Sequence, residues 1–211
     1  MKRFTRLYLD LDATNASAEK ASLIGRYFAE VGEDEAGVAL YFPAGERLDR
    51  TASTALLKRA ALEATGLPEW MLGVCHEAVG DLSETVALLR DAAGGDNDPE
   101  DPGVSAETLD ATYRERLRPF ELATDEAERE RILLGAWRDL DADGRFVFHK
   151  LIRGGFRVGV QRKTVANALA DLTGLPVGLV TQRMSAGLEP TAACYRRVVA
   201  PEGAAADASA P

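Results

Sequence analysis

The four residues Thr65-Gly66-Leu67-Pro68 decide the fold of this chain, because they return 108 positions later as Thr173-Gly174-Leu175-Pro176. Internal similarity at a fixed offset indicates a duplicated structural unit. A run with apolar residues three or four positions apart precedes the second copy and has the spacing of a helix. The sequence therefore predicts a unit of loop, helix, Gly-Leu-Pro turn and helix that occurs twice.

The similarity extends to both sides of these turns. Upstream, AGERL at residues 44–48 parallels GGFRV at residues 154–158. Downstream, VGDLS at residues 79–83 resembles AGLEPT at residues 186–191. We place the repeat halves at about 40–90 and 150–199 and expect them to pack as a pseudo-two-fold pair.

Helix signals dominate the rest of the chain, and no strand pattern competes with them. Side chains that favour helix N-caps precede runs of apolar residues at helical spacing. We expect an all-α fold, with one helical domain over residues 1–200 and a flexible tail or linker over 201–211. Residues 91–103, with five acids and no base, predict an acidic loop. The expected helix starts are Ser17, Thr51 or Ser53, Ser105 and Thr124.

A glycine-rich basic stretch, IRGGFRVGVQRKT at residues 152–164, joins the second repeat to its helix. Glycines allow positive φ and let main-chain amides face an anion, and a following helix N-terminus adds a favourable dipole. We expect Gly154, Gly155 and Gly159 to provide this backbone. The charge is expected from Arg153, Arg157, Arg162 and Lys163.

The chain is acidic overall but contains one positively charged region. The 211 residues carry a net charge of −9, but residues 145–200 hold nine Lys or Arg against two acids, so the remainder carries −16. Such polarity is typical of a protein that presents one face to a phosphate backbone. Two cysteines, Cys75 and Cys194, form no zinc pattern. With no apolar run long enough for a membrane span, we expect no membrane partner and a cytoplasmic, nucleoid-associated location.

Several stretches share a pattern with one known family. They are residues 41–47, 56–68, 78–85 and 150–160, in which GDLSE at 80–84 and GGFRVG at 154–159 are the most specific pieces. PTAACY at 190–195 looks like the end of the same domain. Together they resemble the N-terminal DNA-binding domain of bacterial-type ATP-dependent DNA ligases, over roughly residues 4–199.

The resemblance implies an all-helical domain with an internal pseudo-two-fold repeat that docks on nicked double-stranded DNA through phosphate contacts. A pseudo-two-fold pair can contact the two sides of a duplex, which has local two-fold symmetry itself. In the first repeat, Gly45 and Arg47 would hold phosphates, although Glu46 lies between them. In the second repeat, Gly155, Arg157, Gly159 and Lys163 would do so.

The adenylation motif of that family, Lys-x-Asp-Gly, does not occur in this sequence. We therefore expect no catalytic residue, no metal site and no cofactor in this chain, because ATP and Mg belong to the family's catalytic domains. The expected partners are nicked DNA and a ligase catalytic core in cis. Two alternatives stay open: a free-standing repair adaptor or regulator without ligase activity, and a small-ligand enzyme that uses the glycine loop for a nucleotide.

Other residues have plainer interpretations. Trp137 is expected in the core, His149 lacks a catalytic partner, and residues 139–144 indicate an acidic helix end closed by Gly144 rather than a calcium loop. Phe156 either contacts a sugar edge or anchors the loop inward, and we favour the anchor. The sequence does not decide whether Arg196 and Arg197 touch DNA or stabilise a helix end.

Overall fold

The computed structural model describes residues 1–94 and 108–202, and regular secondary structure in these residues is helical without a strand. This confirms the all-α prediction. Most of the predicted acidic loop, the candidate cap Ser105 and nearly all of the tail lie outside the described residues. In the described part, no helix is both long enough and apolar enough to span a bilayer.

The chain divides into two compact units. Unit 1 contains Met1–Thr5 and Leu48–Gly155, and unit 2 contains Arg6–Arg47 and the chain from Phe156 onward. Helix α1 (Lys2–Ala13) begins in unit 1 and continues in unit 2. The assignment of residues 1–200 to one domain stays a prediction.

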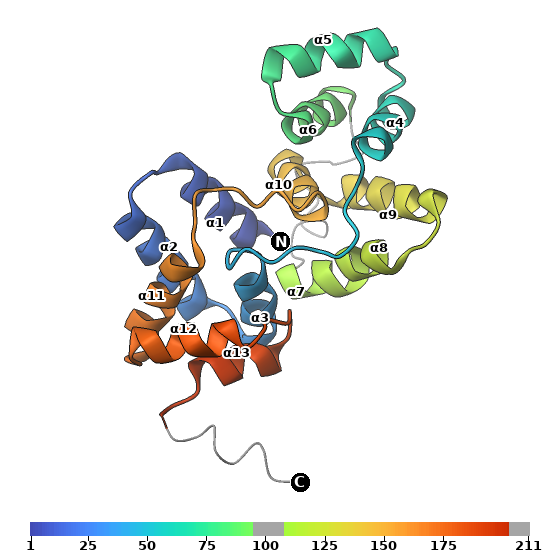
Figure 1. Cartoon of the computed structure of the whole chain (residues 1–211). Coiled ribbons are helices and arrows are strands. Elements are labelled where there is room, and N and C mark those ends of the chain that lie inside the picture. The colour runs from blue at the N-terminus through green and yellow to red at the C-terminus, as the bar shows by residue number, and fades with distance from the viewer. Residues whose placement is uncertain (95–107, 203–211) are drawn as a thin grey trace. The chain divides into compact units, whose positions relative to one another are not determined.

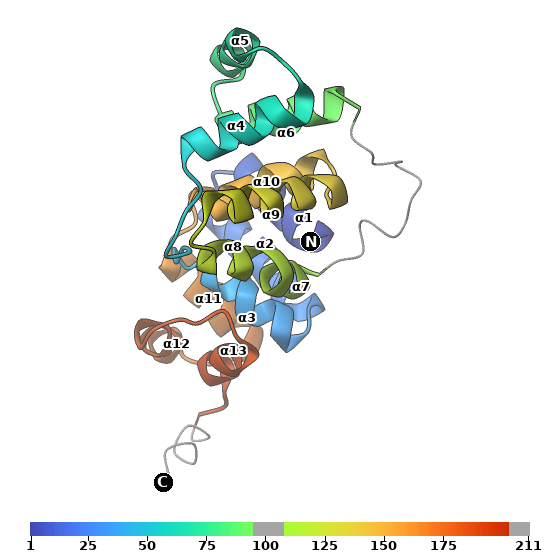
Figure 2. The ribbon, with the colours of Figure 1, turned by 90° about the vertical axis from the view of Figure 1, so that its right-hand side faces the viewer.

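Unit 1 is built around α10, which packs on α6. Helices α4 and α6 lie side by side, and α4 also contacts α9 (Figure 2). The core contains Leu57, Val86, Trp137 and Phe148, each at most 1% exposed. The elements of this unit are α4 (Thr54–Thr65), α5 (Glu69–Val79), α6 (Leu82–Ala92), α7 (Leu109–Thr112), the π-helical turn η1 (Tyr113–Leu117), α8 (Arg118–Leu122), α9 (Glu126–Asp139) and α10 (Ala142–Ile152).

Unit 2 packs α11 on α2 and α13 on α3, with α12 against both α11 and α13 (Figure 1). The backbones of α3 and α13 touch, because a Cβ added at Gly37 would lie 2.3 Å from the carbonyl group of Thr191. Ile24, Leu40, Leu169 and Val198 form part of its core. The elements of this unit, besides most of α1, are α2 (Ser17–Glu30), α3 (Glu33–Tyr41), α11 (Arg162–Thr173), α12 (Val177–Ser185) and α13 (Ala192–Val199).

The two Thr-Gly-Leu-Pro turns have the same local structure. Gly66 and Gly174 are left-handed C-caps of α4 and α11, with φ of 66° and 71°. In each turn the threonine hydroxyl donates a 2.7 Å hydrogen bond to the carbonyl four residues earlier. The proline that follows is the N-cap of the next helix, α5 or α12. The two copies therefore end one helix and begin the next with the same residues and the same hydrogen bonds.

The two units exchange the first helix of each repeat. Helix α3 precedes α4 along the chain but packs on α13 in unit 2, whereas α10 precedes α11 but packs on α6 in unit 1. Each unit therefore combines one helix from one copy with three from the other. The linking segments, residues 42–53 and 153–161, are the glycine loops singled out by the sequence.

Most of the expected helix starts fall at or beside the observed ones. Ser53 is the N-cap of α4 and accepts a 3.0 Å hydrogen bond from the Leu56 amide, while α2 begins at Ser17. The cap of α9 is Asp125, one residue after Thr124. A helix does end in residues 139–144, since α9 ends at Asp139. The role expected for Gly144 is wrong, because Asp141 caps the start of α10 and Gly144 lies inside that helix.

Candidate nucleic-acid interface

Both glycine loops begin by closing a helix. Gly45 (φ +95°) follows α3 and Gly154 (φ +66°) follows α10. Their amides donate to the carbonyl three residues earlier, and the next amides, of Glu46 and Gly155, donate to the carbonyl five residues earlier. This is the 6→1 pattern of a Schellman cap. Gly45 is thus equivalent to Gly154, not to Gly155 as the sequence alignment placed it.

The amides of Gly154 and Gly155 are engaged inside the chain, at 3.1 and 2.8 Å. They are therefore not free to donate hydrogen bonds to an anion, contrary to what the sequence predicted for these two glycines. Beside them, the guanidinium of Arg153 lies 3.4 Å from the hydroxyls of Ser83 and Thr54 in the same unit. The predicted site residues in unit 1 thus form the junction between α10, α6 and the start of α4.

The loop of unit 2 alternates inward anchors with exposed residues. The ring of Phe156 packs edge-on against Tyr8 at 5.2 Å between centroids, and Val158 is 3% exposed. Arg157 and Gly159, which alternate with these anchors, are exposed. This confirms that Phe156 anchors the loop inward, and it shows how the loop presents Arg157 and Gly159 to solvent.

Helix α11 begins with an uncompensated positive end. Its N-cap, Gln161, makes no side-chain cap hydrogen bond, and its first turn has no acidic residue but contains Arg162 and Lys163. In the described chain, the amides of Gly159, Val160 and Lys163 have no hydrogen-bond acceptor. A helix N-terminus carries a partial positive charge, so cations there are unfavourable unless an anion binds. The equivalent helix in unit 1, α4, is capped by a serine and has no cation in its first turn.

Arg162 holds two loops of unit 2 together. Its guanidinium donates to the carbonyl of Ala44 at 3.2 Å and to that of Met184 at 3.3 Å, and it pairs with Glu46. The acidic residue that interrupts the first glycine loop is thereby neutralised. Arg162 therefore places the loop of Gly45 beside the start of α11, and its charge is already engaged.

Three predicted cations of unit 2 remain available. Arg47, Arg157 and Lys163 are exposed, and none has a side-chain hydrogen bond or ion pair with any residue that the structure describes. The backbone of Arg47 is fixed by a 2.9 Å hydrogen bond from the Tyr41 hydroxyl. Unit 2 therefore contains Gly45, Arg47, Arg157, Gly159 and Lys163, together with the bridging Arg162.

Most of the other cations in residues 145–200 stabilise the fold. Arg145 is 1% exposed, Lys150 pairs with Asp81 at 2.5 Å, and Arg183 donates to two carbonyls at the end of α13 and beyond. Arg196 pairs with Glu33, and Arg197 donates to the carbonyl of Gly187, so both take part in contacts inside unit 2. The sequence charge count thus overstated the positive field.

The family-specific Gly-Asp-Leu-Ser-Glu stretch is structural in this chain. Gly80 ends α5 at φ +84°, and Asp81 caps α6 by accepting from the Glu84 amide at 3.0 Å. Burial raises the pKa of the Asp81 carboxyl, but the hydrogen bonds from Lys150 and the Glu84 amide outweigh it and leave the pKa below its usual value. The stretch therefore ties α5 and α6 to α10.

His149 lies at the centre of the same junction and is fully buried. The Trp137 indole donates to its Nε2 at 2.6 Å, and its Nδ1 lies 3.0 Å from the carbonyl oxygen of Ser83. Because Nε2 accepts, Nδ1 carries the proton and donates to that carbonyl. Burial lowers the pKa of His149 to about 4, which keeps the ring neutral. This histidine is a structural bridge of unit 1.

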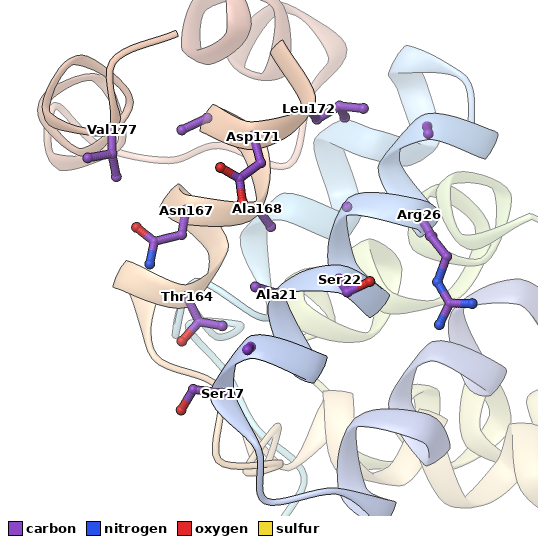
Figure 3. Close-up of a pocket in the computed structure, with 14 residues that line it drawn as sticks. Ser17, Ala21, Ser22, Arg26, Thr164, Asn167, Ala168, Asp171, Leu172 and Val177 are labelled. Carbon is purple, nitrogen blue, oxygen red and sulfur yellow. The ribbon is translucent and has the colours of Figure 1, made fainter. Parts of the chain in front are cut away.

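Sequence reasoning missed a groove between α2 and α11 in unit 2. Figure 3 shows Ser17 and Thr164 at one end of it, with Asn167 and Asp171 further along α11. Its volume is about 910 Å³. The signal was present as small residues at helical spacing on α2, but nothing in the sequence paired that face with α11. The groove opens beside the first turn of α11.

One known protein family matches most of the chain. The family described as DNA ligase N terminus matches residues 1–170. The chain belongs to this family, the N-terminal domain of ATP-dependent DNA ligases. A search of curated proteins gave no match.

Proposed function

We propose that this chain binds nicked double-stranded DNA through the phosphate backbone, without sequence specificity, as the non-catalytic N-terminal domain of an ATP-dependent DNA ligase. Family membership gives the ligase association. The observation that carries DNA binding is the start of α11 in unit 2, which has no side-chain cap and contains the exposed Lys163 in its first turn. The exposed Arg157 lies in the preceding loop, and the exposed Arg47 lies in the loop that Arg162 ties to this helix start. We call these residues the unit 2 interface.

The chemistry of the unit 2 interface favours phosphate over bases. It offers main-chain amides, a helix N-terminus and guanidinium or ammonium groups, which bind phosphate oxygens irrespective of the neighbouring base. No predicted site residue is an asparagine or glutamine, the side chains that read adenine in a groove. Binding should therefore depend strongly on salt and weakly on sequence.

The chemistry of joining is assigned to other parts of a ligase. The sequence lacks a Lys-x-Asp-Gly nucleophile, so ATP, Mg and the adenylated lysine belong to a catalytic core linked in cis. The chain's task is to hold the broken duplex for that core during repair, replication or recombination. A cytoplasmic, nucleoid-associated location fits this task.

The test is fluorescence anisotropy of this chain with labelled nicked, intact and single-stranded DNA of the same sequence at several salt concentrations. We expect nicked duplex to bind with a negative slope of log K against log salt, and a scrambled sequence to bind equally well. Absence of binding to any DNA at low salt would overturn the proposal. Equal binding to nicked and intact duplex would remove the nick preference only.

A further inference from the structure

Lys20 is a buried lysine that lies beneath the glycine turn of unit 2. It comes from α2, is 5% exposed, and its Nζ donates to the carbonyl oxygen of Val158. Within residues 1–94 and 108–202 it makes no ion pair. An ammonium group is therefore held out of water with one main-chain carbonyl as its recorded partner.

A buried charge without a counter-charge is unfavourable, and an apolar side chain of the same length would fill the space at lower cost. Anchoring the turn does not by itself require a charge, since Phe156 and Val158 already fix it from inside. The ammonium therefore suits a partner that residues 1–94 and 108–202 do not supply. That partner must be an anion, and it must approach from the solvent side.

Gly159 provides the opening for such an anion. This residue is exposed and has φ +64°, and a Cβ built on it would lie 2.8 Å from Nζ of Lys20. The ammonium thus lies directly behind the backbone of Gly159, and any other residue there would push it away. Arg157 and Lys163, near Gly159 along the chain, are exposed cations, so no carboxylate of this loop competes.

We propose that Lys20 is a positioning residue for an anion seat at Gly159, where one phosphate of the DNA backbone binds. The hydrogen bond from Lys20 to the Val158 carbonyl fixes the turn. The positive charge of Lys20 attracts the phosphate across the backbone of Gly159, and the two groups make no direct contact. The identity of the anion as a DNA phosphate rests on the proposed function. The binding of an anion at Gly159 does not rest on the proposed function, because such a site recognises a phosphate of any source.

The experiment compares wild-type protein with Lys20→Met, which keeps length and removes charge, and with Lys58→Met on α4 of unit 1 as a charge-matched control. Inorganic phosphate is titrated at constant ionic strength while the Gly159 and Val160 amide signals are followed by NMR. Binding to nicked duplex is measured in parallel over a salt series. We expect phosphate to shift these amides in wild type and Lys58→Met but not in Lys20→Met. Duplex binding of Lys20→Met should fall about tenfold, with a salt slope smaller by about one ion.

The outcomes separate the two proposals. If wild-type amides shift with phosphate but no DNA binds, the seat stands and the proposed function fails. If DNA binds but Lys20→Met matches wild type in amide shifts and salt slope, the role of Lys20 is overturned. A purely structural role would change thermal stability while leaving the salt slope intact, which also overturns it.

Circular dichroism first establishes that Lys20→Met is folded. If it is not, Gly159→Ala replaces it, because the new Cβ would displace Nζ although the lysine itself is retained. This variant should lose the phosphate response at Val160 and bind duplex more weakly than Gly174→Ala, whose added Cβ would meet no atom within 4 Å although its φ is also positive. Equal behaviour of the two alanine variants would contradict the seat.

Discussion

At the scale of single residues, Arg47, Arg157 and Lys163 can be replaced without disturbing packing, because their side chains are exposed and have no described partner. Arg157→Ala should weaken binding to nicked duplex and reduce the salt slope by about one ion, without changing sequence preference. Anisotropy over a salt series measures both. A slope identical to wild type would remove Arg157 from the interface.

Arg196→Ala is the matched control for that change. Arg196 is also exposed, but it pairs with Glu33, so its removal deletes a surface ion pair worth roughly 0–1 kcal/mol. We expect an unchanged salt slope. A slope change as large as that of Arg157→Ala would indicate a general charge effect instead of a localised interface.

Gly154 and Gly155, which follow α10, differ in how well they tolerate a side chain. Gly154 has φ +66°, where an L side chain is strained, so Gly154→Ala should destabilise the protein by about 1 kcal/mol. Gly155 has no positive φ, and an added Cβ would make ordinary contacts at 3.7 Å, so Gly155→Ala should stay within about 0.5 kcal/mol. Urea unfolding of both variants tests the difference, and equal free energies of unfolding would refute it.

At the scale of elements, the start of α11 lacks a side-chain cap, and we propose that this leaves its amides to an anion. Gln161→Ser should add a side-chain cap of the kind that Ser53 gives to α4, raising the free energy of unfolding by about 0.5–1 kcal/mol. The hydroxyl oxygen would act as an acceptor at the helix start where we propose that an anion binds, so DNA affinity should fall. Denaturant unfolding and anisotropy on one preparation measure both. A variant that gains stability and keeps full DNA affinity would place the phosphate elsewhere.

Helix α10 makes unit 1 sensitive to acid through His149. The folded pKa, about 4, lies below the unfolded value of 6.5, so the unfolded chain binds more protons between these pH values. Stability is therefore full above pH 6.5 and declines as pH falls towards 4, by about 2 kcal/mol between pH 7.5 and 5. Denaturant unfolding followed by Trp137 fluorescence measures it.

His149→Gln keeps an amide that can donate and accept but does not titrate in this range. We expect it to flatten the decline between pH 7.5 and 5. His76→Gln on α5, for which burial is only partial, should leave the decline as in wild type. If His76→Gln abolished the decline instead, the buried bridge would not be its cause.

The sequence predicted the positions of helices and turns better than it predicted which helices and side chains contact one another. Glycine and proline at Thr65–Pro68 and its repeat act locally, so the two turns could be predicted from spacing alone. The partners of Lys150, Arg162 and Arg196 are 69, 116 and 163 residues away along the chain, so no local pattern shows that these charges are engaged. Lys20 was missed for the same reason, since the loop above it lies 138 residues further on.

At the scale of the whole molecule, exchange of α3 and α10 between the repeats gives each unit one glycine loop beside the start of one long helix. The starts of these two helices, α4 in unit 1 and α11 in unit 2, differ in their side chains and hydrogen bonds. In unit 1 the helix start is capped by Ser53, and the Asp49 amide is bound to Glu121 at 2.7 Å. In unit 2 the start is uncapped, and its first turn contains Arg162 and Lys163. We therefore propose that the stronger phosphate contacts lie in unit 2.

The most direct test of the central claim is the salt dependence of nicked-duplex binding by a variant that combines Arg47→Ala, Arg157→Ala and Lys163→Ala. The account predicts a folded protein whose log K against log salt slope is smaller than wild type by about three ions, with most of the affinity lost at low salt. A triple variant with the wild-type slope and affinity would contradict the claim that the unit 2 interface holds the DNA backbone.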